Sequence, residues 1–395
     1  MARCSVSGGA SIARYRQGGL TAIEVSREGL HELYVTGVPR DAVQQDSTTQ
    51  AQQVYGALGP WLRERGATGV QERVFGSLRD REAVLAARQA ALSTGAVTVP
   101  WPAAWIEGAP PERDGLAGVQ LYAVAGPECS PVTDQGQLCG VAFDHEEARH
   151  VYLTGLQGPA CAGGPEAAAR CMLAQANRLL QGAGCAYTEV VRTWIYLCDI
   201  LDWYDQFNAV RSAAYAGWGL MGPDSVGWLP ASTGIEGRPP AGGHASLDLY
   251  AIGGPGRQQM AVERVHNPLQ NEANSYGSAF ARGVAVGFGG AETVYVSGTA
   301  AIDEAGHSVH EGDLDGQLTR TLDNIAALLS TRGMGLADIA QATVFVKHGV
   351  EAERAVALLA EHGMAVADGV VVRADVCRPE LLFEVDATAV GLPRD

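Results

Sequence analysis

The chain repeats one strand motif three times, and this repetition constrains its fold more than any other feature. The motif is an alternating apolar run that ends in Thr-Gly or Ser-Gly, and it occurs at His31–Pro39, Arg149–Leu156 and Glu292–Thr299. Self-similarity at a regular period indicates repeated structural units. The spacing here is about the size of one small domain.

The same succession of elements follows each copy of the motif. In the third copy, apolar residues recur every three or four positions over Gly316–Leu329, Gly333 marks a helix end, and alternation returns over Ile339–Lys347. This pattern predicts a strand, an amphipathic helix and a second strand. The corresponding helices of the first two copies are Thr48–Arg65 and Glu166–Leu180.

A second helix and a closing strand complete each copy. The helices are Glu82–Ala91, Asp205–Gly217 and Ala352–His362, and the strands are Leu116–Val124, Ala245–Ile252 and Leu382–Val390. We therefore predict three tandem α/β (α+β) modules with boundaries at 1–130, 131–256 and 257–395. Each has the usual size of a domain.

Composition favours an ordinary globular protein of the cytoplasm. Of 395 residues, 47% are apolar, which is enough for several cores. No apolar run is long enough for a membrane span, and the first residues, MARCSVSGG, lack the apolar stretch of a signal peptide. The eight cysteines form no CxxC pair and no cluster at zinc spacing, so we expect reduced thiols.

Charge and motif content exclude several kinds of partner. A net charge of −16 with only 28 Lys and Arg argues against nucleic acid, because phosphate binding requires a basic face. No glycine-rich motif has the spacing of a nucleotide site. His307 and His310 lie three apart but lack a third ligand nearby, so we expect neither a metal nor a cofactor.

The third module contains motifs that are specific enough to indicate a protein family. The segment Tyr295–Gln317, followed by the helix start Thr321–Ile325, resembles the RidA (YjgF) family. The Gly-His-x-x-His-x-Gly-Asp turn and the ending Val376–Glu384 look closer still to the chorismatases, whose C-terminal half is a RidA-like domain. Further chorismatase-like segments are Arg192–Tyr196, Phe207–Arg211, Asn267–Gln270 and Phe280–Arg282. The resemblance covers residues 145–395.

This resemblance implies an architecture. RidA-like (chorismate-mutase-like) domains assemble as trimers, with a central barrel of sheets, helices outside and ligand clefts between neighbouring domains. Three such modules in one chain would build a pseudo-trimer. We expect it to be a monomer or a weak homo-oligomer in which a single cleft is active.

The resemblance also implies site residues. Glu384 matches the cleft carboxylate that moves protons, and we align it with Gln120 and Asp248. Cys377 shapes the pocket rather than attacks, because no His lies near it in the chain. The predicted substrate-binding residues are Arg192, Arg211, Arg373, Arg378, Tyr196 and Thr299.

Two of these arginines have specific expected roles. RidA-type deaminases clamp the substrate carboxylate with an arginine on the penultimate strand, and Arg373 is the candidate here. Arg192 lies within an apolar strand and needs a partner, which a carboxylate ligand or Glu236 would supply.

The leading functional hypothesis is a cofactor-independent, chorismatase-like hydrolase or lyase of specialised metabolism. Its substrate would be a small unsaturated cyclic carboxylic acid such as chorismate or a relative. Thr388 stands where chorismatases carry a second carboxylate, so the reaction itself stays open. The alternatives are a RidA-type imine or enamine deaminase and a non-catalytic metabolite-binding or chaperone-like protein.

Overall fold

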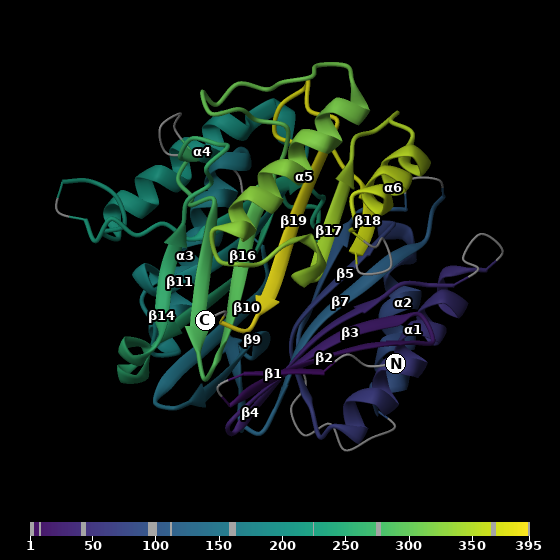
Figure 1. Cartoon of the computed structure of the whole chain (residues 1–395), viewed down its shortest axis with the longest axis vertical. Coiled ribbons are helices and arrows are strands. Elements are labelled where there is room, and N and C mark those ends of the chain that lie inside the picture. Colours follow the sequence, from purple (N-terminus) through teal and green to yellow (C-terminus); the bar gives the residue numbers. More distant parts are fainter. Residues whose placement is uncertain are drawn as a thin grey trace.

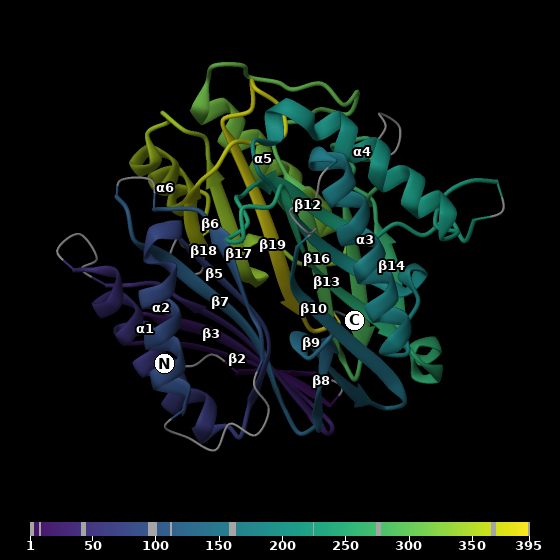
Figure 2. The ribbon, with the colours of Figure 1, turned by 180° about the vertical axis from the view of Figure 1, so that it is seen from behind.

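The computed structural model describes residues 4–7, 9–40, 45–93, 101–110, 113–157, 163–223, 225–273, 278–364 and 369–393. It contains three mixed β-sheets, one for each sequence repeat, and the helices lie on their outer faces (Figure 1). The view from behind shows the same arrangement (Figure 2). Within the described ranges, no helix is both long and apolar enough to span a bilayer.

The first sheet belongs to the N-terminal repeat. Its elements are β1 (Cys4–Ser7), β2 (Ala10–Gln17), β3 (Leu20–Arg27), β4 (Leu30–Gly37), α1 (Ser47–Glu64), β5 (Thr68–Gly76), α2 (Arg81–Ser93), β6 (Ala103–Glu107) and β7 (Leu116–Ala125). The strand order is β1-β2-β3-β4-β7-β5-β6. The closing strand β7 therefore lies between the two strands that α1 connects.

The second and third repeats build six-stranded sheets whose order matches that of the first sheet without β1. The second has β8 (Cys129–Asp134), β9 (Gln137–His145), β10 (Ala148–Gln157), α3 (Gly164–Gly182), β11 (Val190–Leu197), α4 (Ile200–Gly217), β12 (Ala231–Glu236) and β13 (Ala245–Gly253). The third has β14 (Ala261–Val265), β15 (Gly283–Phe288), β16 (Ala291–Thr299), α5 (Leu314–Ser330), β17 (Ile339–Val346), α6 (Ala352–Glu361), β18 (Gly369–Arg373) and β19 (Phe383–Gly391). The predicted strand-helix-strand succession is confirmed in all three.

Local sequence signals explain where the helices begin and end. The side chain of Asp313 caps α5 by accepting a hydrogen bond from the backbone N–H of Gly316. Gly333 follows the helix with a φ of +68°, a conformation that glycine adopts without strain. Helix α4 begins five residues before the predicted start, because Asp199 turns the chain with left-handed backbone angles. The kink at Trp203 then joins two helical segments.

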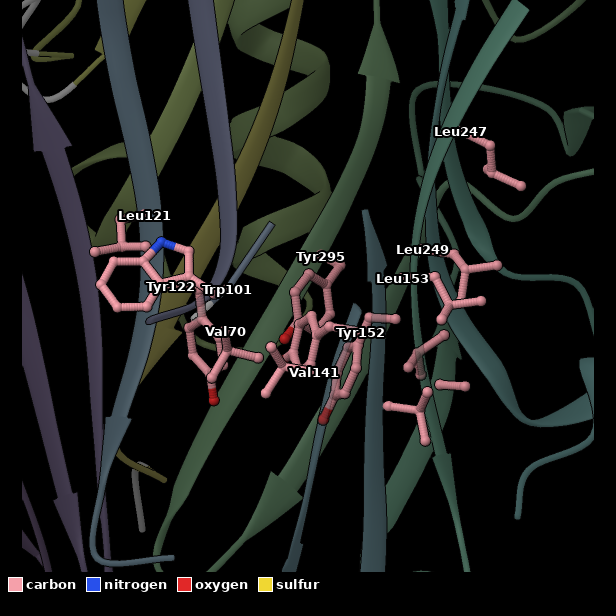
Figure 3. Packing of buried hydrophobic residues seen from close by; sticks show 14 of the residues in the cluster. Val70, Trp101, Leu121, Tyr122, Val141, Tyr152, Leu153, Leu247, Leu249 and Tyr295 are labelled. Carbon is pink, nitrogen blue, oxygen red and sulfur yellow. The ribbon is translucent and has the colours of Figure 1, made fainter. Parts of the chain in front are cut away.

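Tyrosines from all three modules pack together at the centre of the molecule. Figure 3 shows Tyr122, Tyr152 and Tyr295 side by side. Ring centroids lie 5.0 Å apart between Tyr122 and Tyr152, 4.1 Å between Tyr152 and Tyr250, and 5.7 Å between Tyr250 and Tyr295. Each such pair contributes about 1 kcal/mol beyond the burial of its area. This aromatic layer joins the three sheets into one body.

Strand register corrects one alignment. Opposite residues in the paired central strands are Tyr34 and Tyr122 in the first sheet, Tyr152 and Tyr250 in the second, and Tyr295 and Thr388 in the third. Two residues before Tyr122, Tyr250 and Thr388 lie Gln120, Asp248 and Asp386, so these three residues share one position. The prediction that Glu384 occupies that position is wrong by two residues. A shift of two keeps the inward and outward alternation of a strand, so the sequence pattern did not reveal it.

Candidate functional site

A cleft of about 390 Å³ lies between the second and third modules. One wall comes from α4 and β12, with Asn208, Arg211 and Ser232, and the other includes Gly298 of β16 and Glu384 of β19. Hydrogen bonds hold the walls together. The backbone N–H of Ala281 donates to the carbonyl of Pro230 at 2.9 Å, and that of Ser232 donates to the Ser297 hydroxyl at 2.8 Å. These bonds connect the second and third modules beside the cleft.

Glu384 is the buried acid of this cleft, with only 4% of its surface exposed. Burial is the main cause that raises its pKa to about 8, and the nearby Asp386 carboxylate acts in the same direction against Arg192. At neutral pH this carboxyl is mostly protonated and able to donate a proton. Any side chain at Gly298 would collide with the Glu384 carboxyl, so the glycine of the repeated motif makes room for the acid here.

Cys377 lines the same cleft. Burial raises the pKa of its thiol to about 12, with a further contribution from Glu384. A neutral thiol is a poor nucleophile, so this environment suits a pocket-lining residue.

Arg211 supplies a buried cation to the cleft. The residue is 1% exposed, and its guanidinium donates to Asn208 Oδ1 at 2.7 Å and to Ser232 Oγ at 3.4 Å. Among the described groups, none accepts a hydrogen bond from Arg211 Nε and no carboxylate forms a salt bridge with this guanidinium. A buried guanidinium with neutral partners is suited to a carboxylate ligand.

Two further arginines border the cleft. Arg282 is 3% exposed and donates through Nε to the carbonyl of Asn271 at 2.8 Å. Arg378 donates to the carbonyl of Gly306 at 3.0 Å. With Arg211, three arginines line the cleft that holds Glu384, and Asp205 is the other acid among its described lining residues. This arrangement favours a ligand with more than one negative charge.

The first module has an arginine that matches Arg211 but forms a salt bridge within its own module. Arg88 of α2 is the counterpart of Arg211 in sequence, because each arginine lies six residues after the predicted helix start, Glu82 or Asp205. Its Nη2 forms a salt bridge with Glu72 at 2.8 Å, and the Trp101 indole also donates to that carboxylate. At the register position of Glu72 the second module has Thr193. The arginine of the first module is thus neutralised internally, whereas Arg211 is not.

Arg192 lies behind the cleft and does not line it. Its Nη2 donates to Thr233 Oγ1 at 2.6 Å and contacts Asp386 at 3.3 Å, and burial lowers its pKa to about 10. Arg73 of the first module lies 3.9 Å from the same carboxylate. The partner of Arg192 is therefore Asp386, which corrects the expectation of Glu236 or a ligand. Asp386 also places a second carboxylate beside Glu384.

The other predicted binding residues lie elsewhere. Tyr196 is buried in the intermodule core, and burial raises its pKa while Arg73 opposes the change. Thr299 donates to the carbonyl of Ser297 in its own strand at 2.8 Å. Arg373 borders a different cavity of about 510 Å³, with Glu107 and Glu236. Of the eight predicted residues, Glu384, Cys377, Arg211 and Arg378 meet in the cleft.

Sequence reasoning did not assign Asn208 or Arg282 to the site. Both lie within segments that carried the family resemblance, Phe207–Arg211 and Phe280–Arg282. A polar residue in each of these short segments was the available signal. Among the described residues, no group of three His, Cys, Asp or Glu side chains is arranged to hold a metal ion.

The chain is similar in sequence to known proteins. The family described as Endoribonuclease L-PSP matches residues 278–391. The chain is 28% identical over 284 residues to a 3-hydroxybenzoate synthase of Streptomyces hygroscopicus, a match that covers 65% of this chain and 78% of that protein. A chorismatase of the same species is 26% identical over 298 residues, or 69% of this chain and 80% of the relative.

A solved structure extends the likeness in fold to most of the chain. The crystal structure of a chorismatase matches with a TM-score of 0.59 and 21% identity, over 82% of this chain and 93% of that one. The predicted α/β fold of three tandem modules is thereby confirmed.

Proposed function

We propose that this chain, a chorismatase-like protein of the RidA (YjgF) superfamily, is an enzyme that cleaves a small unsaturated cyclic carboxylic acid without a cofactor. The observation that carries the proposal is the pairing of Glu384 with Arg211 in one cleft of about 390 Å³. The first supplies a proton and the second holds a carboxylate. The relatives named chorismatase and 3-hydroxybenzoate synthase support the substrate class.

For chorismate, the reaction is hydrolysis of an enol ether. Glu384 donates its proton to the terminal methylene carbon of the enolpyruvyl group, which leaves a cation stabilised by the ether oxygen. Water adds to the cationic carbon that bears the ether oxygen, and its proton returns to the Glu384 carboxylate. The adduct then breaks its bond to the ring oxygen, which takes up the hydroxyl proton. The products are pyruvate and a ring alcohol, so atoms and charges balance.

The cationic side of the cleft holds the substrate in this mechanism. Chorismate carries two carboxylates, and Arg211, Arg282 and Arg378 surround the cavity. Guanidinium groups bind carboxylates through paired N–H donors, which fix orientation as well as charge. Glu384 in its protonated form adds no negative charge to oppose the ligand.

The alternative functions receive less support. Arg373, the candidate clamp of a deaminase, borders another cavity than Glu384. A net charge of −16 disfavours the RNA substrate that the family description suggests. A non-catalytic binding role would keep the cleft and its arginines but would not require a protonated acid.

The test is release of pyruvate from chorismate by the purified protein, with Glu384→Gln as the matched variant. Glutamine keeps the size of the side chain but has no acidic proton, so we expect release to fall by about 10²- to 10⁴-fold. Equal rates for both proteins would refute the role of Glu384. No release by either, with chorismate still raising the melting temperature, would favour the binding role.

A further inference from the structure

A second cleft, of about 440 Å³, lies between the third and first modules. The second and third modules form the proposed active site between them, and the third and first modules form this cleft in the corresponding way. Its wall residues Gly369 and Val371 of β18 match Ser232 and Gly234 of β12 in strand register. Two related clefts of similar size thus exist in one chain, and only one of them holds Glu384.

The second cleft has lost the chemistry of the first. The position that corresponds to Glu384 is Gly118, where a Cβ atom would already contact Val370. The register position of Arg282 is held by Thr21. Val371 and Val356 contribute apolar surface. With no acid at the position of Glu384, the cleft has the walls of a binding site and not of a proton-transfer site.

Positive charge gathers around this cleft although the chain is acidic. Among the described residues that line it, Arg16, Arg40 and Arg113 are basic and Glu353 is acidic, in a protein of net charge −16. Arg113 donates to the carbonyls of Asp114 and Leu116 at 3.2 and 3.1 Å, contacts that fix the guanidinium without cancelling its charge. Burial lowers the pKa of Arg113. The electrostatic preference of the cleft is therefore for an anion.

We propose that the cleft between the third and first modules is a second, non-catalytic site for a monocyclic aromatic carboxylate. The ring packs against Val356 and Val371, and the carboxylate points toward the arginines at the rim. A flat ring suits the apolar walls, and one carboxylate complements the excess of arginine over glutamate. This inference is independent of the reaction proposed for the first cleft.

The experiment measures calorimetric binding of benzoate, with Ala209→Trp as the background. Ala209 is exposed and lines only the first of the two clefts, so tryptophan there closes that cleft and leaves the second open. We expect the Ala209→Trp protein to bind one benzoate. We also expect benzamide, which has the same ring without the charge, to bind about tenfold more weakly or worse.

Two substitutions at Val356 complete the design. Val356→Trp fills the second cleft and Val356→Glu, at a partly exposed position, places a negative charge in it. Each should lower benzoate affinity at least tenfold, while Val356→Glu keeps the melting temperature of the parent and, in the otherwise native chain, its pyruvate release. Unchanged benzoate binding in both variants, no benzoate binding in the Ala209→Trp protein, or equal binding of benzamide would overturn the proposal.

Discussion

Replacing Asp386 by asparagine should lower the pH at which the enzyme loses activity. Glu384 acts in its protonated form, and its pKa of about 8 sets the expected alkaline limit. Asp386 lies two residues away on the same strand face, about 7 Å along the strand. At an effective dielectric constant of about 20, two unit charges at that distance repel by about 2 kcal/mol, or roughly 1.5 pKa units. Loss of the Asp386 charge also leaves Arg192 without its carboxylate, and both effects lower the pKa of Glu384.

The assay is the pH dependence of kcat for pyruvate release between pH 5 and 10. The wild-type protein should lose activity through about pH 8 and Asp386→Asn about one unit or more lower. Asp248→Asn is the matched control, because Asp248 holds the same position in the second module and contacts the backbone of Gly155 instead. An alkaline limit that stays in place or rises in Asp386→Asn would refute the reasoning. A downward shift in Asp248→Asn equal to that in Asp386→Asn would do the same.

Three further predictions follow from the contacts of Arg211 and Arg88, of Cys377 and of Glu384. Arg211→Met should raise KM about 10- to 100-fold with little change in stability, because the substrate loses a carboxylate partner. Arg88→Met should leave KM unchanged and destabilise the fold by about 3 kcal/mol or more, because the buried Glu72 loses its cation. Steady-state kinetics measure the first effect and urea unfolding the second. Cys377→Ser should keep kcat within about tenfold, since the thiol is neutral and takes no covalent part, and a loss near that of Glu384→Gln would contradict this. In the folded protein Glu384 retains its proton to about pH 8, whereas the unfolded carboxyl releases it near its ordinary pKa of 4.5. The free energy of unfolding should therefore fall as pH rises between these values, by up to about 1.4 kcal/mol per pH unit. Glu384→Gln should flatten this slope in urea titrations at pH 5 and 7.5.

The repeat carried most of the information about the fold. Strand and helix periods differ, and each module places Thr-Gly or Ser-Gly at the end of a central strand, so the order of the main elements could be predicted. The opening strands of the modules, such as β8 with its internal Pro131 and the five-residue β14, were not predicted. They are short or lack regular alternation, and their pairing with neighbours decides their structure.

The site was predictable only in part. Glu384 and Arg211 were found through the family resemblance, but the partner of Arg192 lies 194 positions further along the chain. Pairing at such a distance depends on how the modules pack, which local pattern does not encode. The neutralisation of Arg88 by Glu72 is likewise a tertiary feature. It distinguishes the first module from the second only when strand register is known.

The most direct test of the central claim is a crystal structure of Glu384→Gln soaked with chorismate. The variant should bind the substrate without turning it over. We expect density for the ring in the cleft between the second and third modules, with a carboxylate on Arg211 and the enolpyruvyl methylene next to residue 384. Density only in another cleft, or a pose with the methylene turned away from residue 384, would contradict the account.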